Sequence, residues 1–158
     1  MSEIEQRIKA MGFELPAPFK FPSANRTGCV LVGSILFVSG HGRDLPSLPG
    51  VKHAGKVPAQ VSVEEGYATA RAVALTMLAT VKAHCGDLDR VKRILRLFGM
   101  CNCTPDFVQH PLVIDGASDL FFELWGPQFG KHARTAVGQV SLPRGIAVEI
   151  GGEFELHT

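Results

Sequence analysis

Residues 62–86, SVEEGYATARAVALTMLATVKAHCG, carry the strongest helix signal of the chain. Ser62 and Glu65 have the spacing of a capping box, in which each side chain accepts a hydrogen bond from the other residue's backbone N–H. Gly86 is expected to end the helix. Apolar residues recur every three or four positions and form one stripe: Val63, Tyr67, Ala70, Ala74, Met77 and Val81. We interpret this stripe, including its Tyr and Met, as part of a core.

Strand-like segments lie on both sides of this helix. TGCVLV (27–32) and SILFVSG (34–40) are β-rich and meet at Gly33-Ser34, which predicts a hairpin. VKRILRLFGMCNC (91–103) predicts a strand directly after the helix. A second helix is expected from about 110 to 124, and Gly126-Pro127 would break it. Its apolar stripe consists of Val113, Ala117, Leu120, Phe121 and Leu124.

Two more strands, 132–141 and 146–155, complete the order β-β-α-β-α-β-β. This order predicts an α+β fold, with two helices packed on one face of a single sheet. The other face is left uncovered, which favours self-association. Residues 1–24 predict a short helix followed by an extended, proline-containing arm, and 41–60 a long loop without a core of its own. With no internal repeat, we expect one domain over 1–158.

Composition excludes several classes of protein. Hydrophobic residues make up 46% of the 158 residues and the formal net charge is +1, which argues against disorder and against general attraction to nucleic acid or membranes. The first residues lack the apolar stretch of a signal peptide, and no apolar run approaches the roughly 18 residues of a membrane span. A soluble, cytoplasmic protein is therefore expected.

Four cysteines stand at positions 29, 85, 101 and 103, and six histidines are scattered along the chain. No second Cys/His pair with zinc-ligand spacing accompanies Cys101 and Cys103, so we predict buried free thiols and no metal site. His41 follows the end of the second strand in VSGHGR, and its role stays open.

Arg134 places a permanent cation among small and apolar residues at the start of a strand. On the last strand, Glu149 lies on the face opposite Ile146, Val148 and Ile150. We expect the short loop around Pro143 to bring both strands side by side, so that Arg134 and Glu149 share a cavity. A guanidinium can hold a small carboxylate through two parallel hydrogen bonds, and a carboxylate can orient or deprotonate water. A structural ion pair and two solvated charges remain alternatives from the spacing alone.

Several segments resemble the RidA family, also called YjgF or L-PSP, in the right order over roughly residues 25–156. The resemblance is closest to a longer subgroup with an extra N-terminal helix, often labelled endoribonuclease L-PSP-like. The segments that carry it are SILFVSGH, LDRVKRILRLFGMCN, PDF, GASDLFFELWG and HARTAVGQVSLPRGIAVEI.

This resemblance implies a chorismate-mutase-like fold that forms a homotrimer, with ligand sites in clefts between subunits. It also implies a deaminase that hydrolyses reactive enamines and imines of small 2-amino acids to 2-oxo acids and ammonia, without a cofactor. Arg134 would bind the substrate carboxylate, Glu149 would position the hydrolytic water, and Ser39 would line the cleft. Asp115, which stands where the family has an asparagine near the start of the second helix, would also belong to the substrate site, where its carboxylate could repel an anionic substrate.

Departures from the family pattern favour a second hypothesis, a non-catalytic module that binds a small metabolite in the same cleft. Ala136 replaces the cysteine that the deaminases carry two residues beyond the arginine. The tyrosine that they carry before the first hairpin has no clear counterpart, and this segment offers Phe19 and Phe21 instead. A third hypothesis, the ribonuclease activity of the family label, is disfavoured by the near-neutral charge and the absence of a basic groove with stacking aromatics.

Overall fold

The last strand of the chain, β5 (Val148–Leu156), lies at the centre of a five-stranded mixed sheet. The computed structural model describes all residues, 1–158. Neighbours follow the order β1-β2-β5-β3-β4, with β1 (Cys29–Val32), β2 (Ile35–His41), β3 (Val91–Asn102) and β4 (Ala133–Gln139). Only β3 and β4 pair in parallel, and the other neighbours are antiparallel. The hairpin predicted around Gly33-Ser34 is confirmed as β1–β2.

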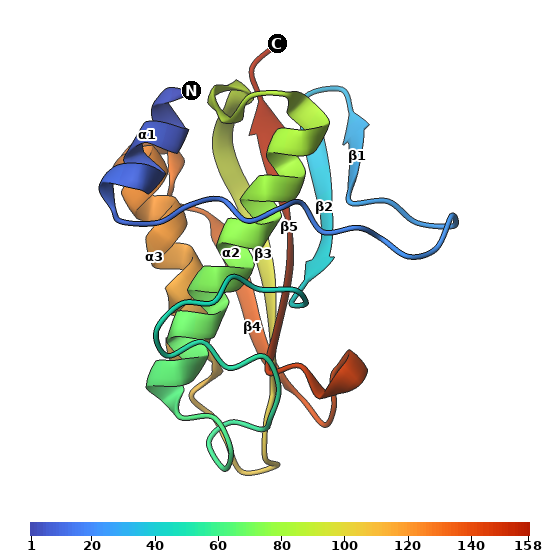
Figure 1. Cartoon of the computed structure of the whole chain (residues 1–158), viewed down its shortest axis with the longest axis vertical. Coiled ribbons are helices and arrows are strands. Elements are labelled where there is room, and N and C mark those ends of the chain that lie inside the picture. The colour runs from blue at the N-terminus through green and yellow to red at the C-terminus, as the bar shows by residue number, and fades with distance from the viewer.

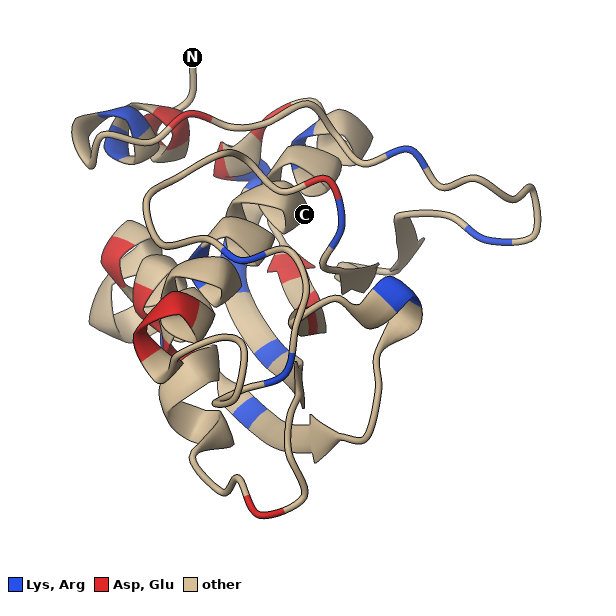
Figure 2. Cartoon of the chain, turned by 60° about the horizontal axis from the view of Figure 1, so that its bottom comes forward, with Lys and Arg blue, Asp and Glu red and all other residues tan.

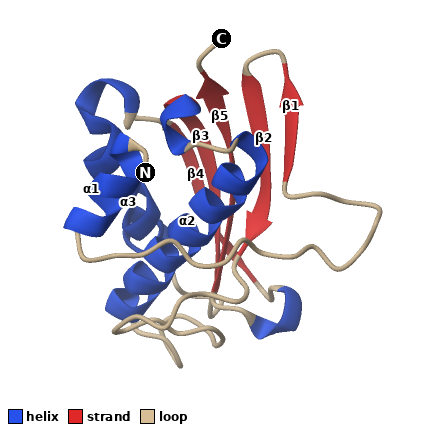
Figure 3. Ribbon diagram, turned by 45° about the horizontal axis from the view of Figure 1, so that its top comes forward, coloured by secondary structure: helices blue, strands red, loops and turns tan.

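The two long helices, α2 (Val63–Cys85) and α3 (His110–Phe129), cover one face of the sheet (Figures 1 and 3). The short α1 (Glu3–Ala10) contacts α3 and the turn η1 (Leu88–Arg90). The α+β class, the element order and the one-sided packing are therefore confirmed. Gly126 adopts a non-helical conformation, so the predicted break in α3 is also confirmed, although one further turn follows it.

Helix α2 begins with the predicted capping box of Ser62 and Glu65. Its burial extends well beyond one stripe, because α3 and the sheet pack against it and the N-terminal arm crosses its outer side (Figure 1). Tyr67 differs from the expectation of a core residue. Its hydroxyl donates to Asp119 Oδ2 over 2.7 Å, so it joins the partly exposed surfaces of α2 and α3. The predicted stripe of α3 is fully buried.

Two glycines determine how closely α3 packs against α2 and against the sheet. A Cβ on Gly116 would lie 2.0 Å from the Tyr67 carbonyl oxygen, and a Cβ on Gly99 would lie 2.6 Å from the Ile114 side chain. These close approaches require glycine, since no larger side chain fits between a helix and its neighbour at such distances. They hold the first half of α3 directly over the edge of the sheet.

The expected pairing of the last two strands is wrong, because β3 lies between β4 and β5. Arg134 is in register with Leu97 of β3, while Glu149 is in register with Met100 of the same strand. The connecting segment crosses the end of β3 through η2 (Pro143–Gly145). A connection of this length spans one or two strand spacings of about 4.8 Å, so loop length alone does not choose the neighbour.

The 41–60 loop also differs from expectation, because it contributes to the core. Leu45 and Val57 are buried in the main hydrophobic cluster. The Val57 N–H donates to the Asn102 carbonyl, and the Thr104 N–H donates to the Val57 carbonyl, which ties the loop to the end of β3. The loop is thereby held by the same packing and backbone hydrogen bonds as the regular elements.

The second face of the sheet carries no helix, as predicted. Its β1–β2 half exposes Val30, Val32, Ile35 and Phe37, which are 39–62% accessible, and we call these four residues the apolar patch. Its β3–β5 half carries ion pairs, such as Arg96 with Glu153. None of the helices combines the length and the apolar character that a membrane crossing demands.

Candidate functional site

A cavity of about 240 Å³ opens where the end of β2, the N-terminal arm and η2 meet. Glu149 contributes the only carboxylate to its lining. The other lining residues come from the arm, the end of β2 and the segment before β5: Phe19, Phe21, Pro22, Arg26, Gly40, His41, Gly42, Arg43, Pro143 and Ile146. We call this space the Glu149 cavity.

Glu149 reaches this cavity because its strand alternates strictly between buried and half-buried positions. Val148 and Ile150 point into the core, which directs Glu149 to the opposite face. No hydrogen bond or ion pair of the structure involves its carboxylate, and burial raises its pKa above the ordinary value. A Cβ on Gly40 would lie 2.9 Å from Glu149 Oε1, so the glycine leaves the room that the carboxylate occupies.

His41 lines the cavity but is held by the fold. Its Nδ1 lies 2.6 Å from the Ser39 carbonyl oxygen and its Nε2 lies 2.8 Å from Thr80 Oγ1 on α2. A carbonyl oxygen only accepts, so Nδ1 carries the hydrogen and Nε2 accepts from the Thr80 hydroxyl. Burial lowers the pKa of His41, which favours this neutral form. Both ring nitrogens are satisfied, so His41 fixes the end of β2 against α2.

Ser39, predicted to line the cleft, is adjacent to the cavity without lining it. Its hydroxyl donates to the Thr27 carbonyl over 2.6 Å, and its backbone N–H donates to the Gly28 carbonyl. Both bonds fasten β2 to the chain segment that follows Arg26. Ser39 therefore positions one wall of the Glu149 cavity.

Two guanidinium groups that belong to no sequence motif, those of Arg26 and Arg43, line the cavity. Neither forms an ion pair, and the Arg43 guanidinium lies 5.5 Å from the centre of the Phe19 ring. Phe19 and Phe21 meet edge to face with their centres 4.9 Å apart. Figure 2 shows basic residues along the arm between α1 and β1. No local motif marked these arginines, because the fold alone brings the arm and the loop after β2 together.

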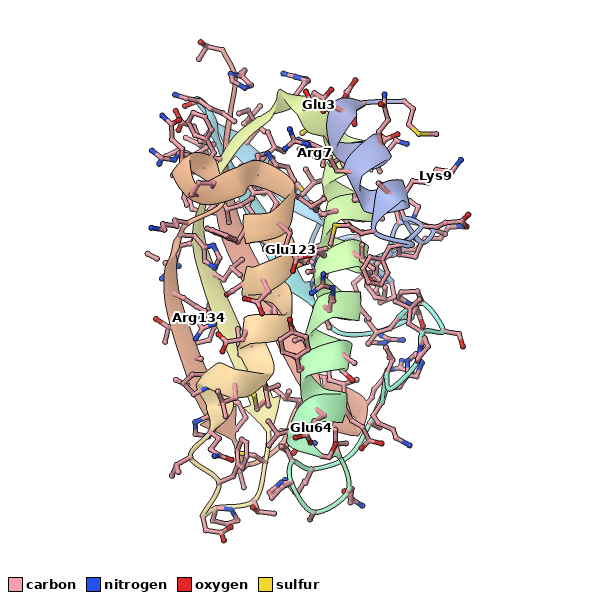
Figure 4. The ribbon with its side chains drawn as sticks, turned by 90° about the vertical axis from the view of Figure 1, so that its left-hand side faces the viewer. Glu3, Arg7, Lys9, Glu64, Glu123 and Arg134 are labelled. Atoms are coloured by element: carbon pink, nitrogen blue, oxygen red, sulfur yellow. The ribbon has the colours of Figure 1, made fainter.

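Arg134 lies on β4 on the face that packs under α3 (Figure 4). Its Nη1 donates to Asp115 Oδ1 over 2.7 Å and to Ser118 Oγ over 3.1 Å, both on α3. Because both bonds use Nη1, the edge formed by Nε and Nη2 has no hydrogen-bond partner. That edge has the two parallel donors that a carboxylate accepts.

His132 completes this network through Ser118. The His132 Nδ1 donates to the Gly130 carbonyl over 2.7 Å, so its Nε2, 2.9 Å away, accepts from the Ser118 hydroxyl. Burial and, to a smaller extent, the charge of Arg134 lower the pKa of His132, in keeping with a neutral ring. We call His132, Ser118, Asp115 and Arg134 the Arg134 network. His132 stands two residues before Arg134, the spacing of one face of an extended segment, whereas no local pattern points to Ser118.

Asp115 therefore pairs with the guanidinium that was expected to hold the substrate. Its negative charge is balanced by Arg134, and its side chain is 39% exposed at the edge of the sheet. Ala136, two residues beyond Arg134, packs against the core and adds no polar group. No three metal-ligating side chains come together anywhere in the chain.

The Glu149 cavity and the Arg134 network lie on opposite faces of the sheet within one chain. Glu149 and Arg134 are separated by β3, and their side chains follow opposite phases of the strand alternation. The single cavity expected to hold both groups is therefore not formed by one chain. The structure instead contains two separate groups of candidate site residues.

Comparison with known proteins gives a consistent result. The model of the family described as "YjgF/chorismate_mutase-like, putative endoribonuclease" matches residues 5–147. Protein TCP17 of Trypanosoma cruzi is 39% identical over 155 residues, which cover 98% of this chain and 94% of that protein.

Among solved structures, a protein of Shewanella oneidensis named as a putative endoribonuclease is 35% identical, with a TM-score of 0.86 over 97% of this chain and 99% of that chain. Escherichia coli TdcF, solved with bound serine, is 19% identical, with a TM-score of 0.52 over 90% of this chain and 94% of that chain, and this likeness concerns the fold. The chain belongs to the YjgF/endoribonuclease L-PSP family, the family that its sequence resembles.

Proposed function

We propose that this protein hydrolyses small 2-imino or 2-enamino acids to 2-oxo acids and ammonia without a cofactor. The observation that carries this proposal is Glu149, an unpaired, half-buried carboxylate in a cavity, with a pKa raised by burial. A general base works best when its pKa approaches the working pH. A volume of about 240 Å³ suits a metabolite of a few heavy atoms.

The reaction follows from this geometry. Glu149 takes a proton from a water molecule as the water oxygen bonds to C2 of the imine and the C=N π electrons move to nitrogen. Glu149 then returns the proton to the nitrogen of the resulting carbinolamine. Glu149 next takes the hydroxyl proton of the carbinolamine and passes it to the nitrogen, so that the C–N bond breaks, ammonia leaves, and the oxygen forms the new carbonyl. The carboxyl group of Glu149 is regenerated in its starting form, so no other proton carrier is required.

Arg134 holds the substrate carboxylate through its Nε–Nη2 edge in this proposal. Asp115 and Ser118 fix the guanidinium from the other side, so the edge is preorganised. Since Arg134 and Glu149 of one chain face opposite ways, the site forms between copies. Glu149 of one copy, beside the wall that Ser39 positions, faces Arg134 and Asp115 of the next. A homotrimer provides this arrangement three times, and the apolar patch supplies surface for self-association.

A second candidate function is binding of the same small acids without turnover. It is favoured by Ala136, which offers no polar side chain beside Arg134, and by the ion pair that Arg134 already forms. TdcF, which shares this fold, was solved with serine, a small molecule that also carries a carboxylate. Calorimetric titration with a 2-oxo acid separates the candidates when it is combined with the ammonia assay on 2-iminopropionate. Binding of the 2-oxo acid that depends on Arg134, without any ammonia release from 2-iminopropionate, identifies a sensor.

The decisive experiment measures ammonia release from freshly generated 2-iminopropionate and uses two inactive variants, Arg134→Ala and Glu149→Ala. Each alone is expected to fall to the buffer rate. After the two are unfolded together and refolded as a mixture, about one quarter of the clefts combine an intact Arg134 with an intact Glu149. Recovery of about that fraction of activity supports a site between copies.

Other outcomes separate the alternatives. A wild-type rate equal to that of the buffer rejects hydrolysis of this substrate. An active wild type with no recovery in the mixture rejects the site shared between copies. In that case, loss of activity in Arg43→Ala identifies Arg43, in the Glu149 cavity, as the residue that holds the substrate carboxylate. RNA degradation that persists in Arg134→Ala and in Glu149→Ala identifies a contaminant.

A further inference from the structure

A thiol and an imidazole meet at the carboxyl ends of the parallel strands β3 and β4, next to the start of α3. Cys103 directly follows β3, and His110 is the first residue of α3. The Cys103 Sγ lies 3.6 Å from His110 Nε2, within reach of a hydrogen bond to sulfur. None of the other three cysteines has a side-chain hydrogen-bond partner. We call these two residues the Cys103–His110 pair.

Two neighbours hold this pair in contact. A Cβ on Gly138 of β4 would lie 2.4 Å from His110 Nε2 and 2.6 Å from Cys103 Sγ, so only a glycine leaves room for both groups. The Phe107 ring meets the imidazole edge to face with the ring centres 5.3 Å apart, which orients the imidazole. The contact is therefore built into the packing of β4, α3 and the turn before α3.

The Cys103–His110 pair lines a cavity of about 290 Å³ that shares no residue with the Glu149 cavity. Val140, which is 83% exposed, lies at the cavity beside Gln139 and Phe107. Apart from His110, no titratable nitrogen or carboxylate lines this space. A ligand of this cavity is accordingly small and uncharged, since a charged one would find no counter-ion there.

The remaining cysteines give an internal comparison. Burial raises the pKa of Cys29 and of Cys101 to about 12 and also raises that of Cys85. Thiols in such surroundings stay protonated and react slowly, because the thiolate is the nucleophile. A histidine beside a thiol accepts its proton and stabilises the thiolate as an ion pair. Cys103 alone has this arrangement.

We propose that Cys103 is a nucleophilic thiol, activated by His110, which adds to small, neutral, electron-poor alkenes. His110 Nε2 takes the thiol proton, and the sulfur forms a bond to the β-carbon of the alkene. The C=C π bond breaks, and its electrons move to the α-carbon, which then takes the proton from Nε2. The product is a thioether, and the step needs no oxidant or further reactant.

N-ethylmaleimide is an alkene of this class that fits the cavity. The full-length native protein is treated with less than one equivalent, and peptide mass spectrometry locates the adduct. We expect Cys103 to react at least about ten times faster than Cys29, Cys85 and Cys101. The His110→Asn variant is expected to slow Cys103 about tenfold at pH 7 and to restore the steep pH dependence of an ordinary thiol. His84→Asn, an exposed histidine next to Cys85, is the matched control and leaves the rate at Cys103 unchanged.

Equal labelling of the four cysteines would overturn the proposal, as would an unchanged rate and pH profile in His110→Asn. A measurement on the wild type alone provides the same test if the variant does not fold. Between pH 6 and pH 8, a lone thiol gains nearly tenfold in rate per pH unit. A clearly shallower profile for Cys103 supports activation by His110, whereas the full slope rejects it.

Discussion

The Glu149 cavity and the Arg134 network occupy opposite faces of one sheet and differ in how far their charges are satisfied. Glu149 has no partner, and its pKa is raised by burial. Arg134 has two hydrogen bonds from one nitrogen, and its acceptors are held by α3 and by His132. The first arrangement favours proton transfer by the carboxylate. The second holds the guanidinium in place as a hydrogen-bond donor.

The two charged groups also differ in their effect on the stability of the folded state. Burying an unpaired carboxylate destabilises the folded state at neutral pH, whereas an ion pair at the sheet edge is close to neutral or slightly stabilising. Removing the charge of Glu149 should therefore lower activity but raise stability. Breaking the ion pair of Arg134 should lower stability.

The largest effect is expected for Glu149→Gln. Removing the general base should lower kcat for 2-iminopropionate by about 10²–10⁴-fold and leave KM nearly unchanged. Stopped-flow measurement of ammonia release checks both parameters. Glu153→Gln is the matched control, because Glu153 lies on the same strand and face but pairs with Arg96. A Glu149→Gln rate within twofold of the wild type would show that the carboxylate takes no part.

Arg134→Lys is expected to act mainly on binding. Lysine keeps the charge but loses the two parallel donors of the Nε–Nη2 edge, so kcat/KM should fall about 10–100-fold, chiefly through KM. Steady-state kinetics separate the two constants. Arg96→Lys changes the same residue type on β3, where it pairs with Glu153, and should leave kinetics unaffected. A fall of the same size in Arg96→Lys would mean that general loss of structure explains the result.

Gly40→Ala affects the Glu149 face alone. The new methyl group would lie 2.9 Å from Glu149 Oε1, and the flexible end of that side chain must move. We expect kcat to fall about tenfold, with a melting temperature within about 2 °C of the wild type. Scanning calorimetry and ammonia release measured on one preparation test this combination. Unchanged turnover would show that the carboxylate position is not critical.

The smallest effects concern stability, and their signs differ between the faces. The folded state holds the Glu149 proton more tightly than the unfolded chain, so this group destabilises the fold progressively as the pH rises above the ordinary pKa of a glutamate, and fully above its raised pKa. Glu149→Gln should raise the melting temperature by about 1–3 °C at pH 8 and leave it nearly unchanged at about pH 3, where the carboxyl is mostly protonated in both states.

Asp115→Asn removes one half of the ion pair and should lower the melting temperature by about 1–3 °C at pH 8. Calorimetry at both pH values measures the two variants together. Shifts of equal sign at pH 8 would contradict the difference between the two faces.

The regular elements were largely predictable because their signals are local. The capping box of Ser62 and Glu65 and the buried stripe of α3 depend on residues within a few positions of one another. The hairpin at Gly33 follows from the turn between two β-rich segments. Family membership followed from the same segments, and it was confirmed by the comparison with relatives.

The neighbours across the sheet were not predictable in this way. Residues 140–147 reach either the adjacent strand or the next one, and only the packing of α3 on β3 and β4 decides that β5 lies on the other side of β3. For the same reason the buried Val57 of the 41–60 loop was missed, since its partners at the end of β3 are about 45 residues away in the sequence. Ser118 and Arg26 gave no local pattern at all.

The sequence by itself determined the element order, the one-sided sheet and the candidate residues Arg134 and Glu149, because helix and strand periodicity and side-chain chemistry are local properties. Tertiary structure alone decided that these two residues face opposite ways, that Asp115 and Ser118 hold Arg134, and that Cys103 meets His110. These relations depend on which strands become neighbours and how closely α3 approaches them. That outcome is fixed by the packing of the whole core, to which every element contributes.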